Sequence, residues 1–322
     1  MTILPRSVIQ LVYLAALIVT PAMAAVDKNS EHATTTFRIY KTIVEMDSSK
    51  NSGGATKVAN YLASEFSRAG FSEQDVEVIP VAQTSALVVK YRGKADSSQP
   101  PILFLGHMDV VEALAKDWER PPFTLTQDKG YFFGRGTLDN KFGIAQISGT
   151  FISLKKAGYV PDRDLIIAFS GDEESGMQST RYLARRPDLL KAAYAINTDA
   201  GGGVLTDDAS AVVYRVQAAE KTYVTFEVEV KNPGGHSSRP RLDNAIYELA
   251  DALKAVQALR FPVMHTPMTL NYLQQTGQLT GGNTGKALMT FANNPQDKAA
   301  ADTLFSMPEY VGTTRTTCVA TM

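Results

Sequence analysis

The segment Ile102-Leu103-Phe104-Leu105-Gly106-His107-Met108-Asp109 decides how the rest of the chain is interpreted. Its short, continuous apolar run is typical of a strand buried on both faces, as in a mainly parallel sheet. Side chains at positions i and i+2 of an extended segment point the same way, so His107 and Asp109 can touch. An imidazole whose second nitrogen is held by a carboxylate is the usual arrangement of a zinc-binding histidine. The alternative is a strand that simply ends in one polar histidine without a metal. Only the downstream sequence distinguishes this alternative from a zinc site.

Two further apolar strands are expected downstream, and acidic residues follow each of them. Glu173 and Glu174 come after the first strand, and Asp199 comes after the second. Another acid, Asp139, precedes an apolar helix expected over residues 144–154. Because ligands of open α/β sheets bind beyond the carboxyl ends of the strands, these side chains are expected to share one crevice with the histidine.

One neutral imidazole with several carboxylates suits zinc, or manganese or cobalt in its place, and does not suit copper or iron–sulfur chemistry. Carboxylates crowded into one pocket repel one another unless dications neutralise them, and two metal ions bridged by one carboxylate meet this requirement. Such a pair lowers the pKa of a bridging water and polarises a substrate carbonyl. A further carboxylate must then accept the proton of the water. In the adjacent Glu173 and Glu174, one residue can bind metal and the other can act as the base.

Composition narrows the classes of function. The 322 residues allow one large or two medium domains. Lys plus Arg (32) nearly balances Asp plus Glu (33), which gives no electrostatic case for binding nucleic acid or an anionic membrane surface. The single cysteine, Cys318, excludes an internal disulfide framework and a thiolate cluster, so a metal site must use His, Asp and Glu.

The N-terminus has the pattern of a secretory signal peptide over residues 1–24. Arg6 supplies the positive charge, residues 8–20 form an apolar core, and an Ala-x-Ala site precedes cleavage after Ala24. An uncleaved membrane anchor is the alternative, although the apolar run is short for a span. We therefore expect a soluble exported protein, periplasmic or secreted, with no membrane contact after cleavage.

The pattern changes after residue 222. Residues 224–230 alternate like a strand with one exposed face, and Asp243 can cap an amphipathic helix over residues 244–259. Residues 276–286 are Gly/Thr-rich and are expected to form a loop, and residues 288–291 a further strand. Since no acidic residues follow the first of these strands, this part of the chain is expected to be a second, smaller domain.

The ordered motifs resemble those of the zinc-dependent family of glutamate carboxypeptidase, aminoacylase, acetylornithine deacetylase and carnosinase. Each motif alone is weak, but the set is specific and extends from about residue 36 to the end. The motifs are His107-Met108-Asp109, Gly134-Arg135-Gly136 with Asp139-Asn140-Lys141, Asp172-Glu173-Glu174-Ser175-Gly176, Asp199 and Gly234-Gly235-His236-Ser237. Residues 313–321 resemble the Gly-Xaa carboxypeptidase and secreted N-acyl-amino-acid hydrolase branch.

The resemblance implies an α/β fold with a mainly parallel sheet, the catalytic domain of zinc exopeptidases, over residues 25–215. It also implies an inserted, smaller α+β lid and dimerisation domain over residues 216–312. Residues 313–322 would begin the return to the catalytic domain. A homodimer formed through the lid is expected.

The resemblance assigns a role to each residue of the crevice. His107 would bind one zinc ion, with Asp109 orienting its ring. Asp139 would bridge two zinc ions, and its peptide bond to Asn140 is expected to be cis. Glu173 would be the general base and Glu174 a ligand of the second ion.

Two further roles come from the same resemblance. Asp199 would bind the metal ion held by His107, and an aspartate here is commoner among peptidases of the group. His236 would lie in the lid and reach across a dimer to stabilise the oxyanion.

The chain departs from the family at its end. The family has a last metal-binding histidine near the C-terminus, whereas this sequence stops at Met322, and neither His32 nor His265 matches that position. The sequence therefore resembles a C-terminally truncated fragment that would hold its metals incompletely, expose sheet edges and be inactive.

The function expected from these residues is hydrolysis of amide bonds in small peptides by a secreted two-zinc metallopeptidase of carboxypeptidase or dipeptidase type. An N-acyl-amino-acid amidohydrolase is an alternative with the same machinery. A catalytically silent binding or dimerisation protein of the same fold is a third possibility, because a fold does not fix a function. The sequence does not distinguish the substrates of the first two.

Overall fold

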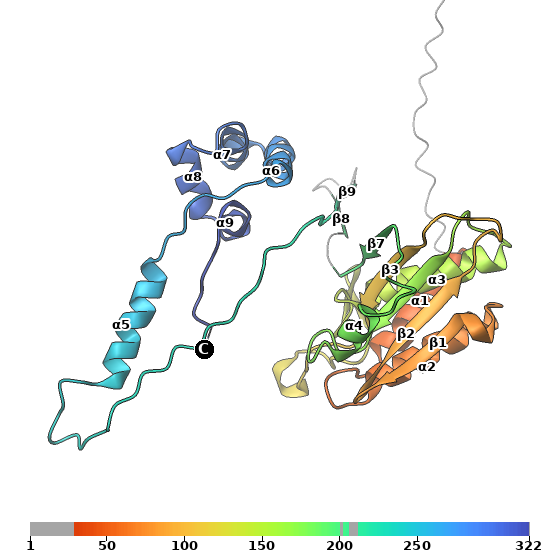
Figure 1. Ribbon diagram of the computed structural model, residues 1–322, viewed down its shortest axis with the longest axis horizontal. Coiled ribbons are helices and arrows are strands. Elements are labelled where there is room, and N and C mark those ends of the chain that lie inside the picture. Colours follow the sequence, from red (N-terminus) through yellow and green to blue (C-terminus); the bar gives the residue numbers. More distant parts are fainter. Residues whose placement is uncertain (1–28, 200–201, 206–211, 322) are drawn as a thin grey trace, which may run out of the picture. The chain divides into compact units, whose positions relative to one another are not determined.

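The computed structural model describes residues 29–199, 202–205 and 212–321 (Figure 1). The chain divides into two compact units, Met1–Glu220 and Lys221–Met322, which are described separately. The expected signal peptide, residues 1–24, lies outside the described residues. Within the described residues, no helix combines the length and apolarity needed to cross a membrane.

A five-stranded sheet organises the first unit, in the order β1-β2-β6-β3-β7. Strands β6, β3 and β7 are parallel, whereas β1 pairs antiparallel with β2 and β2 antiparallel with β6. The α/β fold is thus confirmed, and β1 and β2 make the sheet mixed. The strands are β1 (Val76–Val81), β2 (Thr84–Tyr91), β3 (Ile102–His107), β6 (Leu165–Ser170) and β7 (Tyr194–Asn197).

Helices cover both faces of this sheet. Helices α1 (Glu31–Val44), α2 (Gly54–Arg68) and α3 (Lys141–Lys156) pack on one face, and the short helix α4 (Gln178–Leu183) packs on the other. The remaining elements of the unit are short: 3₁₀ turns at Glu73–Asp75 and Ala115–Asp117, and the hairpins β4 (Thr126–Asp128)–β5 (Tyr131–Phe133) and β8 (Gly202–Leu205)–β9 (Val212–Arg215).

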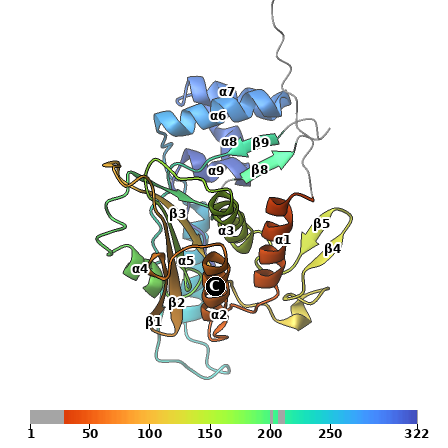
Figure 2. The same cartoon turned by 90° about the vertical axis from the view of Figure 1, so that its right-hand side faces the viewer.

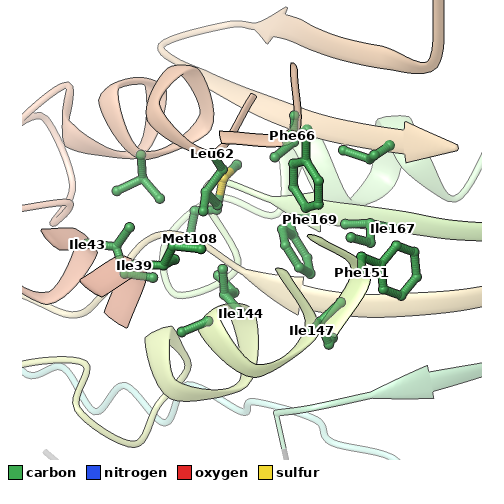
Figure 3. Packing of buried hydrophobic residues seen from close by; sticks show 14 of the residues in the cluster. Ile39, Ile43, Leu62, Phe66, Met108, Ile144, Ile147, Phe151, Ile167 and Phe169 are labelled. Atoms are coloured by element: carbon green, nitrogen blue, oxygen red, sulfur yellow. The ribbon is translucent and has the colours of Figure 1, made fainter. Parts of the chain in front are cut away.

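The alternation of side chains along the central strands produces two apolar layers. On β6, Ile167 and Phe169 point to the layer under α1, α2 and α3, whereas Ile166 and Ala168 point to the layer that includes Leu183 of α4. Figure 3 shows the first layer, in which residues of all three helices surround these β6 side chains. Burial on both faces fixes the register of the strands, and therefore the positions at which they end.

Helices α1 and α3 approach closely at a glycine. A Cβ atom on Gly149 of α3 would lie 2.0 Å from Oγ1 and 2.9 Å from Cβ of Thr36 on α1. Both residues are buried, with Thr36 only 6% exposed. Only a residue without a side chain fits at this crossing.

Strand β7 forms the edge of the described sheet next to β3. Its four residues are exposed, including Tyr194 (54%) and Ile196 (44%). An exposed edge with apolar side chains is a surface that other strands or chains can cover.

In the second unit, the described secondary structure from residue 245 onward is mainly helical, and residues 221–244 are irregular. Its apolar core joins α6, α7 and α8 through Leu273, Leu288, Phe291 and Leu304. Figure 2 shows α6 and α7 side by side. The helices are α5 (Ala245–Ala258), α6 (Pro267–Thr280), α7 (Gly282–Asn293), α8 (Lys298–Phe305) and α9 (Pro308–Thr314).

Three expectations for this unit are wrong. Residues 224–230 form no strand and are mostly exposed, since an alternating segment needs a partner strand to bond its backbone. Residues 276–286, expected to form a loop, mostly belong to α6 and α7, where Gly277 and Gly285 let the two helices meet closely. Residues 288–291 lie inside α7, because a short apolar run does not distinguish a strand from a buried helix.

The close approach of α1 and α3 gives a test of the fold. Gly149→Ala is expected to lower the free energy of unfolding by about 1–3 kcal/mol, because the new methyl group overpacks the crossing at Thr36. Urea denaturation measures the change. Thr150→Ala, at an exposed position of the same helix, is the control and should change stability by no more than about 0.5 kcal/mol. Equal stability of the two variants would contradict the packing at Gly149.

Candidate metal centre

The expected site residues meet at the carboxyl ends of the parallel strands. His107 is the last residue of β3, and the pairing of β3 with β6 places it opposite Ser170. The loop that follows β6 carries Glu173 and Glu174. Asp199 follows β7, and Asp139 lies two residues before α3.

One imidazole lies at the centre of this group. The Nε2 atom of His107 lies 2.8 Å from Oδ1 of Asp139 and 3.2 Å from Oδ1 of Asp199. Two sets of potential ligand atoms, each within 4.8 Å of one another, share this histidine: one adds Glu173 and Asp199, and the other adds Asp139 and Glu174. The structure thus brings together every residue of the expected crevice.

Asp109 connects the histidine to the glutamate pair. His107 Nδ1 lies 3.1 Å from the Asp109 backbone oxygen and 3.5 Å from its carboxylate oxygen Oδ1. The two carboxylate oxygens accept the backbone N–H groups of Glu173 and Glu174, each at 3.0 Å. The sequence predicted the contact with the imidazole but not the contact with the loop after β6. One buried carboxylate therefore holds both sides of the site.

A second buried acid holds the loop after β6 from its other end. The carboxylate of Asp172 accepts the backbone N–H groups of Gln178 at 2.7 Å and Ser179 at 2.9 Å, and also the Ser179 hydroxyl. Its backbone oxygen accepts the N–H groups of Gly176 and Met177. These contacts fix the backbone around Glu173 and Glu174. An acid six residues before the start of α4 was the signal that the sequence offered.

The end of β3 rests on a polar contact that sequence reasoning missed. Asn140 Oδ1 accepts a hydrogen bond from the Thr198 hydroxyl at 3.2 Å and lies 3.4 Å from the backbone nitrogen of His107. A Cβ atom on Gly106 would come within 2.8 Å of the same Asn140 oxygen, and one on Gly143 within 2.4 Å of the Thr198 hydroxyl. The two glycines make room for this contact. The Asp139–Asn140 peptide bond is cis, as the resemblance implied.

Lys141 is buried beside the same loop although the sequence assigned it no role. Its side chain is fully buried, and Nζ donates to the Met46 backbone oxygen at 2.7 Å. Burial lowers the pKa of Lys141 to about 7, although Asp47 and Asp109 act in the opposite direction. Its aliphatic part packs where a side chain on Gly136 would stand.

The electrostatics of the group favour a cation. Burial lowers the pKa of His107, but the hydrogen bond with Asp109 and the charges of Asp199 and Asp139 outweigh it and raise the value to about 10. Burial, followed by neighbouring carboxylates, raises the pKa of Glu173 and of Glu174. One imidazole among crowded carboxylates is a hard, anionic ligand set that fits a divalent ion such as zinc. The residues present therefore fit a metal centre.

The centre is open on one side. The side chains of Asp139 and Asp199 are 60% and 29% exposed, whereas His107 and Asp109 are 2% and 3% exposed. His236, expected to act at the same site, belongs to the second unit, where its Nδ1 lies 2.8 Å from the Ser238 hydroxyl. Its role stays a prediction.

Comparison with known proteins identifies the family. The family model described as peptidase family M20/M25/M40 matches residues 103–280, more than half of the chain. The chain belongs to this family. The matched segment includes every residue of the metal centre described above.

Among curated relatives, the chain is 32% identical over 209 residues to N-fatty-acyl-amino acid synthase/hydrolase PM20D1 of Xenopus tropicalis, covering 60% of this chain and 41% of the relative. It is 33% identical over 179 residues to probable carboxypeptidase S-like 2 of Dictyostelium discoideum, covering 53% and 34%. It is 31% identical over 212 residues to probable succinyl-diaminopimelate desuccinylase of Staphylococcus aureus, covering 65% and 48%. The chain thus spans a third to a half of the length of these curated relatives.

Among solved structures, human carnosine dipeptidase 1 aligns with a TM-score of 0.46 and 18% identity, over 52% of this chain and 39% of that one.

Metal binding can be tested directly on the protein. Zinc added to metal-free protein is expected to raise the thermal midpoint, because the ion binds the assembled site and not the unfolded chain. His107→Ala removes the shared ligand of both sets and should abolish bound zinc in elemental analysis. His265→Ala, outside the centre, is the control and should keep it. Zinc retained by His107→Ala at the wild-type amount would contradict the assignment.

The double contact of Asp109 gives a second test at the same site. Asp109→Asn keeps the shape of the side chain but replaces one acceptor oxygen, so one of the two N–H groups of Glu173 and Glu174 loses its acceptor. Hydrogen exchange of this loop in metal-free protein is expected to accelerate on the order of tenfold, the effect of one lost bond to a charged group. The exposed Asp117→Asn is the control. Unchanged exchange in Asp109→Asn would disprove the anchoring role.

Proposed function

We propose that the protein is a two-zinc metallopeptidase that hydrolyses amide bonds of small peptides and is of carboxypeptidase or dipeptidase type. The observation that carries this proposal is the pair of ligand sets around His107, in which Glu173 and Glu174 fall into different sets. Membership of the peptidase family supports it. The choice of small peptides as substrates follows the expectation from the sequence.

In this proposal the side chains of the centre divide into ligands and a base. His107, Asp139 and Asp199 would hold one zinc ion, and Asp139 and Glu174 would contribute to the second. When bound, zinc would polarise the substrate carbonyl and lower the pKa of water. Cobalt or manganese could replace zinc in this ligand set.

Glu173 is the proposed general base. Burial, together with the neighbouring carboxylates, raises its pKa and so brings its proton affinity closer to that required of a base at neutral pH. It accepts the proton of the attacking water and passes it to the leaving nitrogen. Asp109 fixes its backbone through the hydrogen bond to the Glu173 N–H.

A second candidate activity uses the same residues. The names of two relatives, a fatty-acyl-amino acid synthase/hydrolase and a desuccinylase, refer to amide bonds between an acyl group and an amino acid. An N-acyl-amino-acid amidohydrolase therefore remains the alternative. Export, and a homodimer formed through residues 216–312, remain predictions from the sequence.

The test compares wild-type protein with Glu173→Ala on glycyl-leucine and N-acetyl-leucine. Wild type is expected to prefer the dipeptide. Glu173→Ala should keep its zinc and lose about 10²–10⁴-fold in kcat, the usual contribution of a positioned base. The exposed Glu119→Ala is the control.

Other outcomes of this test would favour the other candidates. A preference for N-acetyl-leucine would favour the amidohydrolase. Zinc binding without turnover of either substrate would favour the silent binding protein. Turnover by Glu173→Ala equal to wild type would show that another group is the base.

A further inference from the structure

Asp139, the proposed bridge between two zinc ions, has few contacts of its own. Its side chain is 60% exposed, and His107 Nε2, 2.8 Å from Oδ1, is its one hydrogen-bonding partner in the described part of the chain. Its backbone forms no hydrogen bond with any described residue. The position of this carboxylate must therefore be set by the neighbouring residues of the segment 137–141.

Two side-chain hydrogen bonds attach this segment to helix α1 and to the residues that follow the helix. At one end of the segment, the Tyr40 hydroxyl donates to the Thr137 backbone oxygen at 2.8 Å. At the other end, Lys141 Nζ donates to the Met46 backbone oxygen at 2.7 Å. Tyr40 lies in α1, and Met46 lies two residues beyond its end. The proposed metal ligand thus lies midway between two anchors.

Helix α1 is a rigid base for these anchors, because its apolar face belongs to the core of the first unit. Ile39 and Ile43 are fully buried there (Figure 3). Tyr40 is 6% exposed, and its ring packs edge-on against Phe132 and Phe142, with centroids 5.9 and 6.0 Å away. Burial raises the pKa of Tyr40 to about 12, so its hydroxyl keeps its proton at neutral pH and stays a donor.

The lysine anchor occupies a place where apolar side chains are normally found. Lys141 is fully buried, and its Cδ atom lies only 3.0 Å from where a Cβ atom on Gly136 would stand. Lysine is seldom buried completely, because its nitrogen then loses its contacts with water. A methionine fills a similar space without that cost, so packing alone does not explain the amino group. What the amino group adds is the bond to the Met46 oxygen, and either protonation state of the nitrogen can donate it.

We propose that Tyr40 and Lys141 are positioning residues that hold Asp139 at the metal centre by anchoring the segment 137–141 to α1. Neither residue belongs to the two ligand sets, so each acts through the backbone of the segment. The inference rests on the proposed function in one respect, that Asp139 is a zinc ligand. Because Asp139 is the proposed bridge, loss of either anchor is expected to weaken the binding of both zinc ions together.

Tyr40→Phe tests the first anchor without changing charge, and it keeps the ring that packs against Phe132 and Phe142. The full chain is freed of metal, and its affinity for zinc is measured by competition with a chromophoric chelator. Affinity is expected to fall about fivefold, the effect of one neutral hydrogen bond.

Tyr91→Phe is the matched control. Tyr91 is also a buried tyrosine whose hydroxyl donates to a backbone oxygen, that of Tyr159. It pairs with Leu165, the first residue of β6, whereas the metal centre lies beyond the last residue of that strand. This variant should bind zinc as tightly as wild type, whatever its effect on stability.

Lys141→Met tests the second anchor and keeps most of the length of the side chain. Zinc affinity is expected to fall about tenfold, the upper end of the effect of one hydrogen bond. Removing positive charge beside a cation site would by itself strengthen zinc binding, so weaker binding reports the lost anchor and not the lost charge. Lys156→Met, at the exposed opposite end of α3, is the control and should bind zinc like wild type.

Urea denaturation of the metal-free variants separates positioning from a merely structural role. Positioning predicts weaker zinc binding by folded protein, whereas a structural role predicts lower stability with unchanged affinity. Wild-type affinity in Tyr40→Phe overturns the role of Tyr40, and wild-type or stronger affinity in Lys141→Met overturns that of Lys141. If Lys141→Met does not fold, the result with Tyr40→Phe decides whether anchoring to α1 positions Asp139.

None of these measurements uses turnover, so the two proposals can fail separately. Wild-type protein that binds zinc but hydrolyses neither glycyl-leucine nor N-acetyl-leucine would refute the proposed hydrolase, while weaker zinc binding by the two variants would still support positioning. Turnover by wild type, with unchanged zinc affinity in both variants, would refute positioning alone.

Discussion

The structure of the first unit depends on gathering several carboxylates around one buried imidazole. His107 is 2% exposed, and the surrounding acids raise its pKa to about 10. Without a metal ion the crowded carboxylates repel one another, and burial together with these neighbours raises the pKa of Glu173 and of Glu174. A divalent ion removes this conflict. The centre is thus complementary to a metal and poorly suited to being left without one.

This repulsion has to be resisted by the backbone, and two kinds of contact do so. The register of β3 between β6 and β7 aligns the strand ends, while apolar layers on both faces hold the strands. The buried carboxylates of Asp109 and Asp172 then hold the loop after β6 through its N–H groups. Like-charged side chains can therefore remain close because their backbones are fixed independently of them.

The parts that the sequence predicted are those with local signals. The apolar strands that end in His107 or precede Asp199 could be predicted, because a buried strand is a run of consecutive apolar residues that ends at a polar one. The hydrogen bonds that Asp109 accepts from the backbone N–H groups of Glu173 and Glu174 could not be predicted. Every residue except proline carries such an N–H group, so the residue type gives no signal. The prediction of a strand over residues 224–230 was wrong for another reason. Their alternation suits a strand, but no described strand pairs with them.

The exposure of the centre is one-sided, and this gives its two sides different roles. Asp139 is 60% exposed, which marks the open side of the centre in the first unit. Asp109 closes the other side, where a cavity of about 180 Å³ begins. Since Asp109 contacts His107 and holds the backbone of both Glu173 and Glu174, a change in its surroundings reaches the proposed base and two proposed metal ligands together. The side of the centre that faces away from solvent is therefore the side from which its geometry can be adjusted.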